Sequence, residues 1–361
     1  MFHRTRFSSR RGLAALVVFS CGVAVVACGG DDESSESAPS SVAESAAAAS
    51  TTASSETSAV SEPAAGTAYP LEIENCGRTL TFDAAPERIV GIDQISTEIL
   101  LELGAAASVV GTANQSDPAS DAVAGEFETV PVLAANYPTA EELVTAEPDF
   151  VVGNLEFLSF SQESGFGGPL TRDELDERGA NSFALVCMGE EDSTQLLFDR
   201  VLQLGQILDA EEVAEAAIAE AQAALDTAAD LLAGAEPVPT LIYIDGRGPI
   251  QTLGTDLADV GGANVLAPDE GGCCPPEIGI EAIAERDPAA VLVTSFGSLD
   301  PDAPTFENKT AALTELLPTV TAVQDERYLA IDFIAFSTPA RIVHDVNTIG
   351  AFLHPDLDFP T

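Results

Sequence analysis

Basic residues are scarce in this chain. The sequence holds 14 Lys plus Arg against 59 Asp plus Glu, which gives a formal net charge of −45 at pH 7. Four of the basic residues lie in the first eleven positions, so only ten remain in the rest of the chain. So acidic a protein repels phosphate backbones and anionic lipid surfaces. The composition therefore argues against nucleic acid and against direct binding to an anionic membrane surface. Solubility or salt adaptation explains the acid excess itself.

Histidine and the sequence motifs of common enzymes are also lacking. Beyond the N-terminal segment the only histidines are His344, within a helical pattern, and His354, directly before a proline. The chain has no Gly-x-Ser-x-Gly elbow, no His-Glu-x-x-His, no phosphate loop and no complete dinucleotide fingerprint. Gly246-Arg247-Gly248 is only a fragment of that fingerprint. The sequence predicts that the protein is not an enzyme, has no cofactor and has no metal site.

Only one long apolar run is present, from Gly12 to Ala27, and it is too short to span a membrane. Arginines precede it and small residues end it directly before Cys28, as in a secretory signal. The Cys28 context resembles a bacterial lipobox, so we predict a signal peptide over 1–27 and diacylglycerol on Cys28. The alternative is an ordinary signal peptide with a chance cysteine. General secretion and twin-arginine export both remain open.

Residues 28–68 contain mostly Ser, Ala, Glu and Thr, with almost no large apolar side chains. Such a segment buries too little surface to offset its ordering entropy, so we expect a disordered linker. Together with the acyl chains it predicts a protein that is lipid-anchored on the extracytoplasmic face of the cell membrane.

Four cysteines remain beyond the linker, and they allow three pairings. We favour a disulfide between Cys76 and Cys187, because both belong to the first predicted lobe. Cys273 and Cys274 are then left as a vicinal disulfide or as thiols. A zinc site at this adjacent pair is disfavoured, because no histidine lies nearby.

Strand and helix patterns alternate along the rest of the chain, which predicts an α/β fold with parallel sheets. We expect two Rossmann-like lobes, with mainly parallel sheets, at 69–192 and 236–361. Proline-free helical patterns over 193–235 predict connecting helices, one of them long. A β-hairpin is expected around Asn75-Cys76-Gly77.

One segment occurs twice, which supports two similar lobes. In each copy a glutamate opens a short amphipathic run, a proline follows seven residues later, and an apolar strand comes next. The glutamates are Glu141 and Glu281, and the prolines are Pro148 and Pro288. An acid in a first helical turn is favourable in itself. Equal placement in both lobes favours a docking function instead.

Several segments resemble an actinobacterial substrate-binding lipoprotein of the iron-siderophore and cobalamin family of ABC importers. They are Tyr69-Pro-Leu-Glu-Ile-Glu-Asn-Cys-Gly-Arg, Ala85-Pro-Glu-Arg-Ile-Val, Thr97-Glu-Ile-Leu-Leu-Glu-Leu-Gly, Ala146-Glu-Pro-Asp-Phe-Val, Asp259-Val-Gly-Gly-Ala-Asn-Val and Arg286-Asp-Pro-Ala-Ala-Val-Leu-Val. The resemblance runs from about Tyr69 to the C-terminus. It implies two lobes joined by a long helix, a ligand cleft between them, and a glutamate on each lobe that pairs with arginine pockets on the permease. Glu141 and Glu281 match those positions.

Ligand residues are expected at the carboxyl ends of strands, where clefts form in open α/β sheets. Arg247 is the strongest candidate, because it follows a strand in a glycine turn and its planar fork suits an anionic ferric siderophore. Arg341 is the second, with an intramolecular salt bridge as the alternative. For the aromatic candidates, the alternative is a role in core packing. The remaining candidates are Asp93, Gln94, Asn114, Tyr137, Asn154, Phe157, Phe296, Phe333 and Phe336.

Together these expectations predict a monomeric protein that binds a ferric siderophore and delivers it to an ABC permease. Cobalamin or haem is the alternative ligand. An extracytoplasmic enzyme or a surface lipoprotein without transport function on the same scaffold is the second alternative. The chain has no tryptophan and a single lysine, Lys309, whereas relatives use tryptophan or several basic residues. The sequence therefore leaves the chelate, the permease and the state of Cys273 and Cys274 undetermined.

Overall fold

The structure is a computed structural model that describes residues 66–161, 168–190, 193–244, 250–251, 262–264, 277–295, 299 and 302–360. The chain divides into two units, Met1–Glu62 and Pro63–Thr361, and every described residue belongs to the second. Cys28, Arg247, Cys273, Cys274 and Phe296, and a helix expected at Thr255–Val260, lie outside the described residues. Within those residues no helix is both long and apolar enough to cross a membrane.

The N-terminal lobe begins with the expected hairpin of β1 (Leu71–Asn75) and β2 (Arg78–Phe82). Its turn residues Cys76 and Gly77 have φ of 54° and 73°. Two consecutive positive φ angles are typical of the tight turns that match the twist of a hairpin. The structure joins Cys76 to Cys187 by a disulfide with an S–S distance of 2.06 Å. This is the pairing that the sequence favours, and it ties the turn to the end of β7.

A five-stranded parallel sheet forms the centre of this lobe, in the order β5-β4-β3-β6-β7. Its core includes Ile89, Phe150 and Phe183, all fully buried, and the two phenylalanine rings meet edge to face. The strands are β3 (Ile89–Gly91), β4 (Val109–Ala113), β5 (Val132–Ala134), β6 (Phe150–Leu155) and β7 (Asn181–Val186). The helices are α1 (Gln94–Glu102), η1 (Ala105–Ala107), α2 (Ala124–Phe127), α3 (Ala140–Thr145), α4 (Glu156–Phe160) and α5 (Arg172–Asp176).

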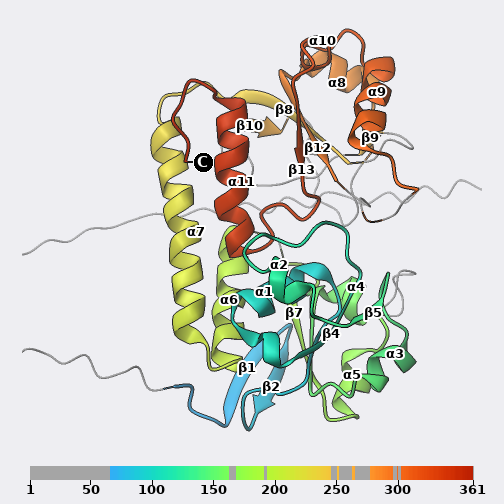
Figure 1. Cartoon of the computed structure of the whole chain (residues 1–361), viewed down its shortest axis with the longest axis vertical. Helices are drawn as coiled ribbons and strands as arrows, with labels where there is room; N and C mark the ends of the chain where they lie inside the picture. The colour runs from blue at the N-terminus through green and yellow to red at the C-terminus, as the bar shows by residue number, and fades with distance from the viewer. Residues whose placement is uncertain are drawn as a thin grey trace, which may run out of the picture. The chain divides into compact units, whose positions relative to one another are not determined.

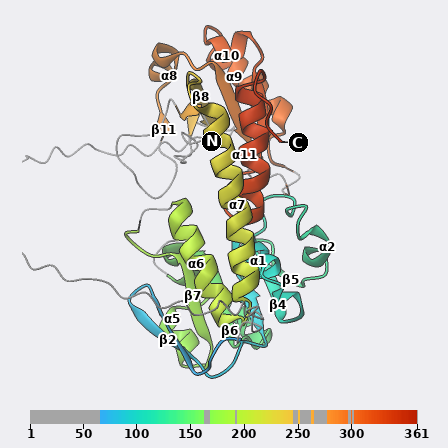
Figure 2. The ribbon, with the colours of Figure 1, turned by 90° about the vertical axis from the view of Figure 1, so that its left-hand side faces the viewer.

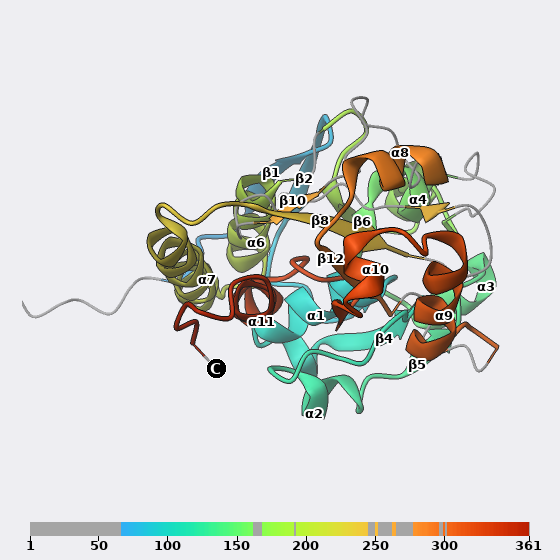
Figure 3. The same cartoon turned by 90° about the horizontal axis from the view of Figure 1, so that it is seen from above.

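Two helices connect the lobes, as the proline-free pattern predicted: α6 (Thr194–Ile207) and α7 (Glu211–Leu232). The buried face of α7 is a stripe of Ala214, Ala221 and Ala228, seven residues apart. Ala214 packs so close to α6 that a β-carbon at Gly205 would lie 2.6 Å from its methyl group. Ala228 packs in the core that includes α11 (Pro339–Leu353). Small side chains thus let α7 pack against α6 and α11, and Figures 2 and 3 show α7 beside α11.

The C-terminal lobe has a parallel sheet in the order β10-β8-β12-β13 (Figure 1). Its core around Tyr243, Val291 and Leu313 is separate from that of the first lobe. The strands are β8 (Val238–Tyr243), β9 (Ile250–Gln251), β10 (Gly262–Asn264), β11 (Glu277–Ile278), β12 (Ala290–Thr294) and β13 (Tyr328–Ile331), of which β9 and β11 form a small antiparallel pair. The other helices are α8 (Ile280–Arg286), α9 (Phe306–Leu316) and α10 (Thr321–Gln324). The predicted fold class, two α/β lobes with parallel sheets joined by a long helix, is confirmed.

The two lobes follow one topology. In the first, β6 pairs with the first strand β3; in the second, β12 pairs with the first strand β8. The repeated segment leads into β6 and β12, and in both copies the residue before the proline is left-handed, Glu147 at φ 49° and Asp287 at φ 43°. The duplication read from the sequence therefore corresponds to equivalent structural positions.

Candidate functional site

Each sheet has a point where the strand order reverses. In the first lobe the chain moves outward from β3 to β4 and β5, then returns to β6 on the other side of β3. In the second lobe the same reversal separates β8 from β12. Because parallel crossovers are right-handed, connections in opposite directions leave on opposite faces, and in open α/β sheets a crevice generally forms at such a point. Ligand sites in open α/β sheets lie there, at the carboxyl ends of strands.

Asp93 and Asn154 meet at the reversal point of the first lobe. Asp93 caps α1: its Oδ1 accepts hydrogen bonds from the backbone N–H and the hydroxyl of Ser96, both at 2.9 Å. Its Oδ2 accepts the backbone N–H of Asn154 at 2.7 Å. Burial raises the pKa of the Asp93 carboxyl, while these hydrogen bonds act in the opposite direction. The carboxylate thus fixes the backbone at the end of β6 and leaves the Asn154 side chain partly exposed.

Tyr137 adds an aromatic hydroxyl near this point. The pKa of its phenol is raised, first by burial and next by the Asp93 carboxylate, whereas Ser159 and Asn114 lower it. Asn114 follows β4 with φ 46°, a left-handed conformation that asparagine tolerates better than most residues. Asn114, Tyr137, Asn154 and Phe157 are all partly exposed. The sequence nominated these four, and the structure brings them to the carboxyl edge of one sheet.

The C-terminal lobe contributes Ser295 and the segment after β13. Ser295 directly follows β12, and its hydroxyl hydrogen-bonds Asp117 of the first lobe. Asp117 Oδ1 also accepts the backbone N–H of Phe333 at 3.2 Å. Burial raises the pKa of the Asp117 carboxyl. Because Asp117 lies in the loop after β4, this contact brings the carboxyl ends of β4, β12 and β13 together. Arg247 and Phe296 follow β8 and β12 in sequence, but both lie outside the described residues.

Arg341 is buried and paired within the protein. Its Nε and Nη2 donate to the two oxygens of Glu98 at 2.6 and 2.8 Å, and Nη1 donates to Asp332 at 2.5 Å. Nη2 also donates to the Pro118 carbonyl at 2.9 Å. The salt bridge that the sequence left as the alternative for Arg341 is therefore present. It joins α11 to α1 and to the loop that carries Asp117.

Phe336 is partly buried and packs against apolar groups around α7 and α11. Its backbone has φ 61°, and its N–H donates to Asp345 at 2.8 Å. The side chain thus contributes to core packing, which was the alternative for the aromatic candidates.

The paired glutamates lie as the repeat predicted. Glu141 and Glu281 are exposed and occupy the first turns of α3 and α8. Thr139 and Glu142 form a capping box on α3, so the cap uses Glu142 and not Glu141. Among the described residues neither Glu141 nor Glu281 has a side-chain hydrogen bond or ion pair. Because each helix begins at the carboxyl edge of its sheet, each glutamate lies at the same edge as the strand ends described above.

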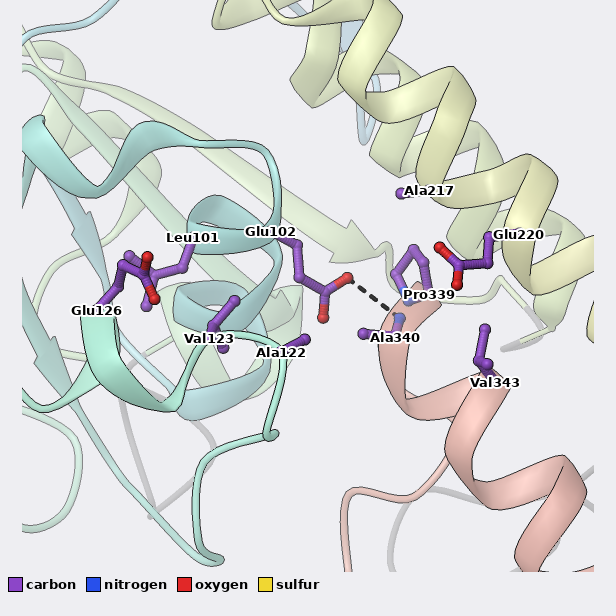
Figure 4. A pocket seen from close by; sticks show the side chains of 10 residues that line it. All are labelled: Leu101, Glu102, Ala122, Val123, Glu126, Ala217, Glu220, Pro339, Ala340 and Val343. Carbon is purple, nitrogen blue, oxygen red and sulfur yellow. Dashed lines mark hydrogen bonds between the residues drawn. The ribbon is translucent and has the colours of Figure 1, made fainter. Parts of the chain in front are cut away.

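A pocket of about 200 Å³ lies between α1, α2, α7 and α11, away from the strand ends (Figure 4). Glu102 lines it and accepts hydrogen bonds from the Thr338 hydroxyl at 2.5 Å and the Ala340 N–H at 3.2 Å. Burial raises the pKa of Glu102 to about 7, against the effect of these two donors. Glu126 and Glu220 also line the pocket. The pocket marks the contact of the first lobe with the start of α11.

Sequence reasoning missed Glu98, Glu102, Asp117 and Ser295. Glu98 and Glu102 lie four residues apart in α1, a spacing that is usual for a solvated helix face. Glu98 is buried and Glu102 is partly buried, and the start of α11, more than 230 residues later, packs against both. No local signal marks such a contact. Cys76, Glu156 and Cys187 have the spacing of metal ligands, but both sulfurs belong to the disulfide.

Comparisons with known proteins agree with this architecture. The structure resembles a periplasmic binding protein from Veillonella parvula, with a TM-score of 0.67 and 21% identity over 79% of this chain and 97% of that one. It also resembles an ABC-type Fe3+-hydroxamate transport system protein from Saccharomonospora viridis (TM-score 0.60, 20% identity, 77% and 99% covered). A third similar structure is a periplasmic heme-binding protein from Pseudomonas aeruginosa (TM-score 0.59, 20% identity, 76% and 95% covered).

Among curated protein sequences, none matches this chain. The family model described as periplasmic binding protein matches residues 89–332, which run from the first strand of one parallel sheet to just beyond the last strand of the other. The chain therefore belongs to the periplasmic binding protein family.

Proposed function

We propose that this protein captures an iron chelate, a ferric siderophore, between its two lobes and delivers it to an ABC permease. One observation carries the proposal: the Asp117–Ser295 contact brings the carboxyl ends of both sheets together. Polar and aromatic side chains lie at that edge of the first lobe, where its strand order reverses. A ligand held there touches both lobes. Its binding therefore favours one lobe arrangement, which a permease can recognise.

The proposed contacts come from both lobes. Tyr137 and Asn154 supply hydrogen-bonding groups and Phe157 an apolar surface from the first lobe. Arg247, Phe296 and Phe336 are the proposed contacts of the second. We place Arg341 beneath the ligand, since Glu98, Asp332 and Pro118 already use its donors.

The proposal includes the attachment and docking of the protein. Cys28 carries the lipid anchor, and the linker to residue 68 separates the folded part from the membrane. The Cys76–Cys187 disulfide suits the oxidising extracytoplasmic compartment. Glu141 and Glu281 pair with arginines of the permease, because each is an exposed carboxylate at an equivalent position of its lobe.

Haem is the second candidate ligand, favoured by the name of the heme-binding neighbour and by the aromatic side chains at the carboxyl edge. Cobalamin is a further alternative. A surface lipoprotein without a small ligand, or an extracytoplasmic enzyme on this scaffold, remains as a different class.

Thermal-shift screening of the purified protein tests the proposal. The panel comprises ferric hydroxamates, ferric catecholates, haem and cobalamin. Ligand at 100 times its Kd stabilises the folded protein by about 2.7 kcal/mol, which gives a clear rise in Tm. A shift with an iron chelate supports the proposal, and a shift with haem alone replaces the ligand. No shift with any of the four would contradict a transport function.

A further inference from the structure

The basic residues of the folded region limit the charge of the ligand. Ten Lys and Arg follow the N-terminal segment, and nine of them lie in described parts of the chain. Four of the nine come shortly before a strand, at the amino edge of a sheet, opposite to the candidate site. These are Arg88 before β3, Arg178 before β7, Arg286 before β12 and Arg327 before β13. By topology, none of the four reaches a ligand at the carboxyl edge.

The other five described basic residues are committed within the protein. Arg172, Arg200 and Arg341 are at most 8% exposed, and they pair with Glu156, Glu190 and Glu98 respectively. Lys309 is 1% exposed and donates to the Thr294 carbonyl at 2.8 Å. Arg78 lies in the hairpin and bridges Asp173 and Asp176 of α5. Removing Arg341 from its ion pair to serve a ligand is costly, because Glu98 is fully buried and would keep an unpaired charge.

Among the described residues, the groups that remain at the carboxyl edge are acidic or neutral. Asn114, Tyr137 and Asn154 are neutral, and the Asp93 and Asp117 carboxyls accept hydrogen bonds from N–H and O–H groups. Arg247 is the single basic residue of the folded region outside the described part. It adds one positive charge to the folded region, and one positive charge does not balance several negative ones.

We propose that the site selects a neutral or cationic ferric chelate, a trihydroxamate, against a tricatecholate; this rests on the proposed function. Ferric iron bound by three hydroxamates, each with one negative charge, gives a neutral centre. Three catecholates, each with two negative charges, give a complex with three negative charges. Placing that complex against carboxylates and uncharged dipoles is unfavourable, because like charges and unpaired buried charges both cost binding free energy.

Isothermal titration of the purified mature protein with two matched probes tests the inference. Ferrioxamine B is a trihydroxamate with one positive charge, and ferric enterobactin is a tricatecholate with three negative charges. We expect the trihydroxamate to bind at least a hundredfold tighter, and its Kd to rise with salt because opposite charges are screened. Equal or tighter binding of the tricatecholate overturns the inference and leaves the proposed function standing. Binding of neither probe overturns both.

A charge variant shows whether charge is the basis of the selection. Asn154→Lys adds a cation at the end of β6, and Asn154→Gln is its neutral control. We expect the lysine variant to reduce the ratio of the two Kd values at least tenfold and the glutamine variant to leave that ratio within about threefold. The ratio is informative even where both affinities fall, because a lost contact weakens both probes. A lysine variant with an unchanged ratio overturns the inference, provided that its Tm shows a folded protein.

Discussion

The two lobes share a topology but not a chemistry. Both place a glutamate in the first turn of the helix that leads into the strand beside their first strand. At the contact between them, however, the N-terminal lobe supplies the carboxylates, Glu98, Glu102 and Asp117. The C-terminal lobe supplies the donors, which are the Arg341 guanidinium, the Thr338 and Ser295 hydroxyls and two backbone N–H groups.

This difference reflects two requirements on a duplicated fold, one set by a partner that contacts both lobes and one set by the contact between the lobes. A partner that touches both lobes is served by equal positions, so the exposed glutamates remain equivalent. A contact between the lobes needs complementary groups, because two copies of one surface would set like charges against each other. In the first lobe a disulfide also closes the hairpin onto β7.

The largest effect is expected from the equivalent positions. The double variant Glu141→Ala with Glu281→Ala should abolish chelate uptake by cells that carry the cognate permease, with ligand Kd changed less than about twofold. Both side chains are exposed, so their loss does not disturb the fold. Glu215→Ala with Glu285→Ala, which also removes two exposed acids, is the matched control and should transport normally. Normal transport by the first pair would refute the docking function.

Loss of the disulfide should destabilise the first lobe next most strongly. The bond closes a loop with a sequence separation of 111. Chain entropy predicts a loss of about 4–5 kcal/mol in the free energy of unfolding for Cys76→Ser with Cys187→Ser. Urea denaturation under oxidising conditions measures this difference. Adding a reductant should destabilise the parent and leave the double variant unchanged, and equal sensitivity of both would contradict the bond.

The buried ion pair tests the complementary contact. Arg341→Met leaves the fully buried Glu98 without its cation and should cost about 3–5 kcal/mol in the free energy of unfolding. Adding Glu98→Leu should recover much of that loss, because no buried charge then stays unpaired. Arg178→Met, at an exposed arginine, is the control and should change stability by less than about 0.5 kcal/mol. A double variant as unstable as Arg341→Met alone would show that the pair is not coupled.

Glu102 predicts a pH dependence with a defined sign. Its pKa of about 7 in the folded protein exceeds the ordinary value of 4.5, so the folded protein holds a proton that the unfolded chain releases. The contribution of this proton to the stability of the folded protein is complete below pH 4.5. As the pH rises through about 7 the contribution is lost, which lowers the free energy of unfolding by about 1–3 kcal/mol. Asp345, with a pKa raised to about 6 by burial, adds a similar slope at slightly lower pH. Unfolding of Glu102→Gln between pH 5 and 8 should show a shallower fall than the parent, and an unchanged slope would contradict this assignment.

The smallest effect compares the two glutamate helices directly. In α3, Thr139 and Glu142 form a capping box, whereas α8 begins at Gly279 without a side-chain cap. Thr139→Ala should therefore cost about 1 kcal/mol in the free energy of unfolding. Gly279→Ser should stabilise by a few tenths of a kcal/mol, because glycine is already an acceptable cap. If both substitutions destabilise equally, the difference in capping between the two helices does not affect the free energy of unfolding.

Much of the architecture could be predicted because it depends on local patterns. Apolar–polar alternation marked the hairpin strands, short apolar runs marked the strands of the sheets, and the long run without proline marked α6 and α7. The turn residues Cys76 and Gly77 marked the hairpin, and the repeat marked Glu141 and Glu281 as equivalent. Strand ends could be nominated as ligand positions for the same reason, since a strand ends where its pattern ends.

No local sequence pattern predicts the strand order, and none predicts the place where each sheet reverses. Only tertiary pairing set β6 beside β3 and β12 beside β8, and so brought Asp93 to Asn154. Only the packing of α11 onto α1 decided that Glu98 is a buried partner of Arg341 and not a surface acid. The sequence by itself determined the elements, the duplicated lobes and the scarcity of cations. The tertiary structure decided which of those few cations are already paired, because ion pairs join residues that are far apart in the chain.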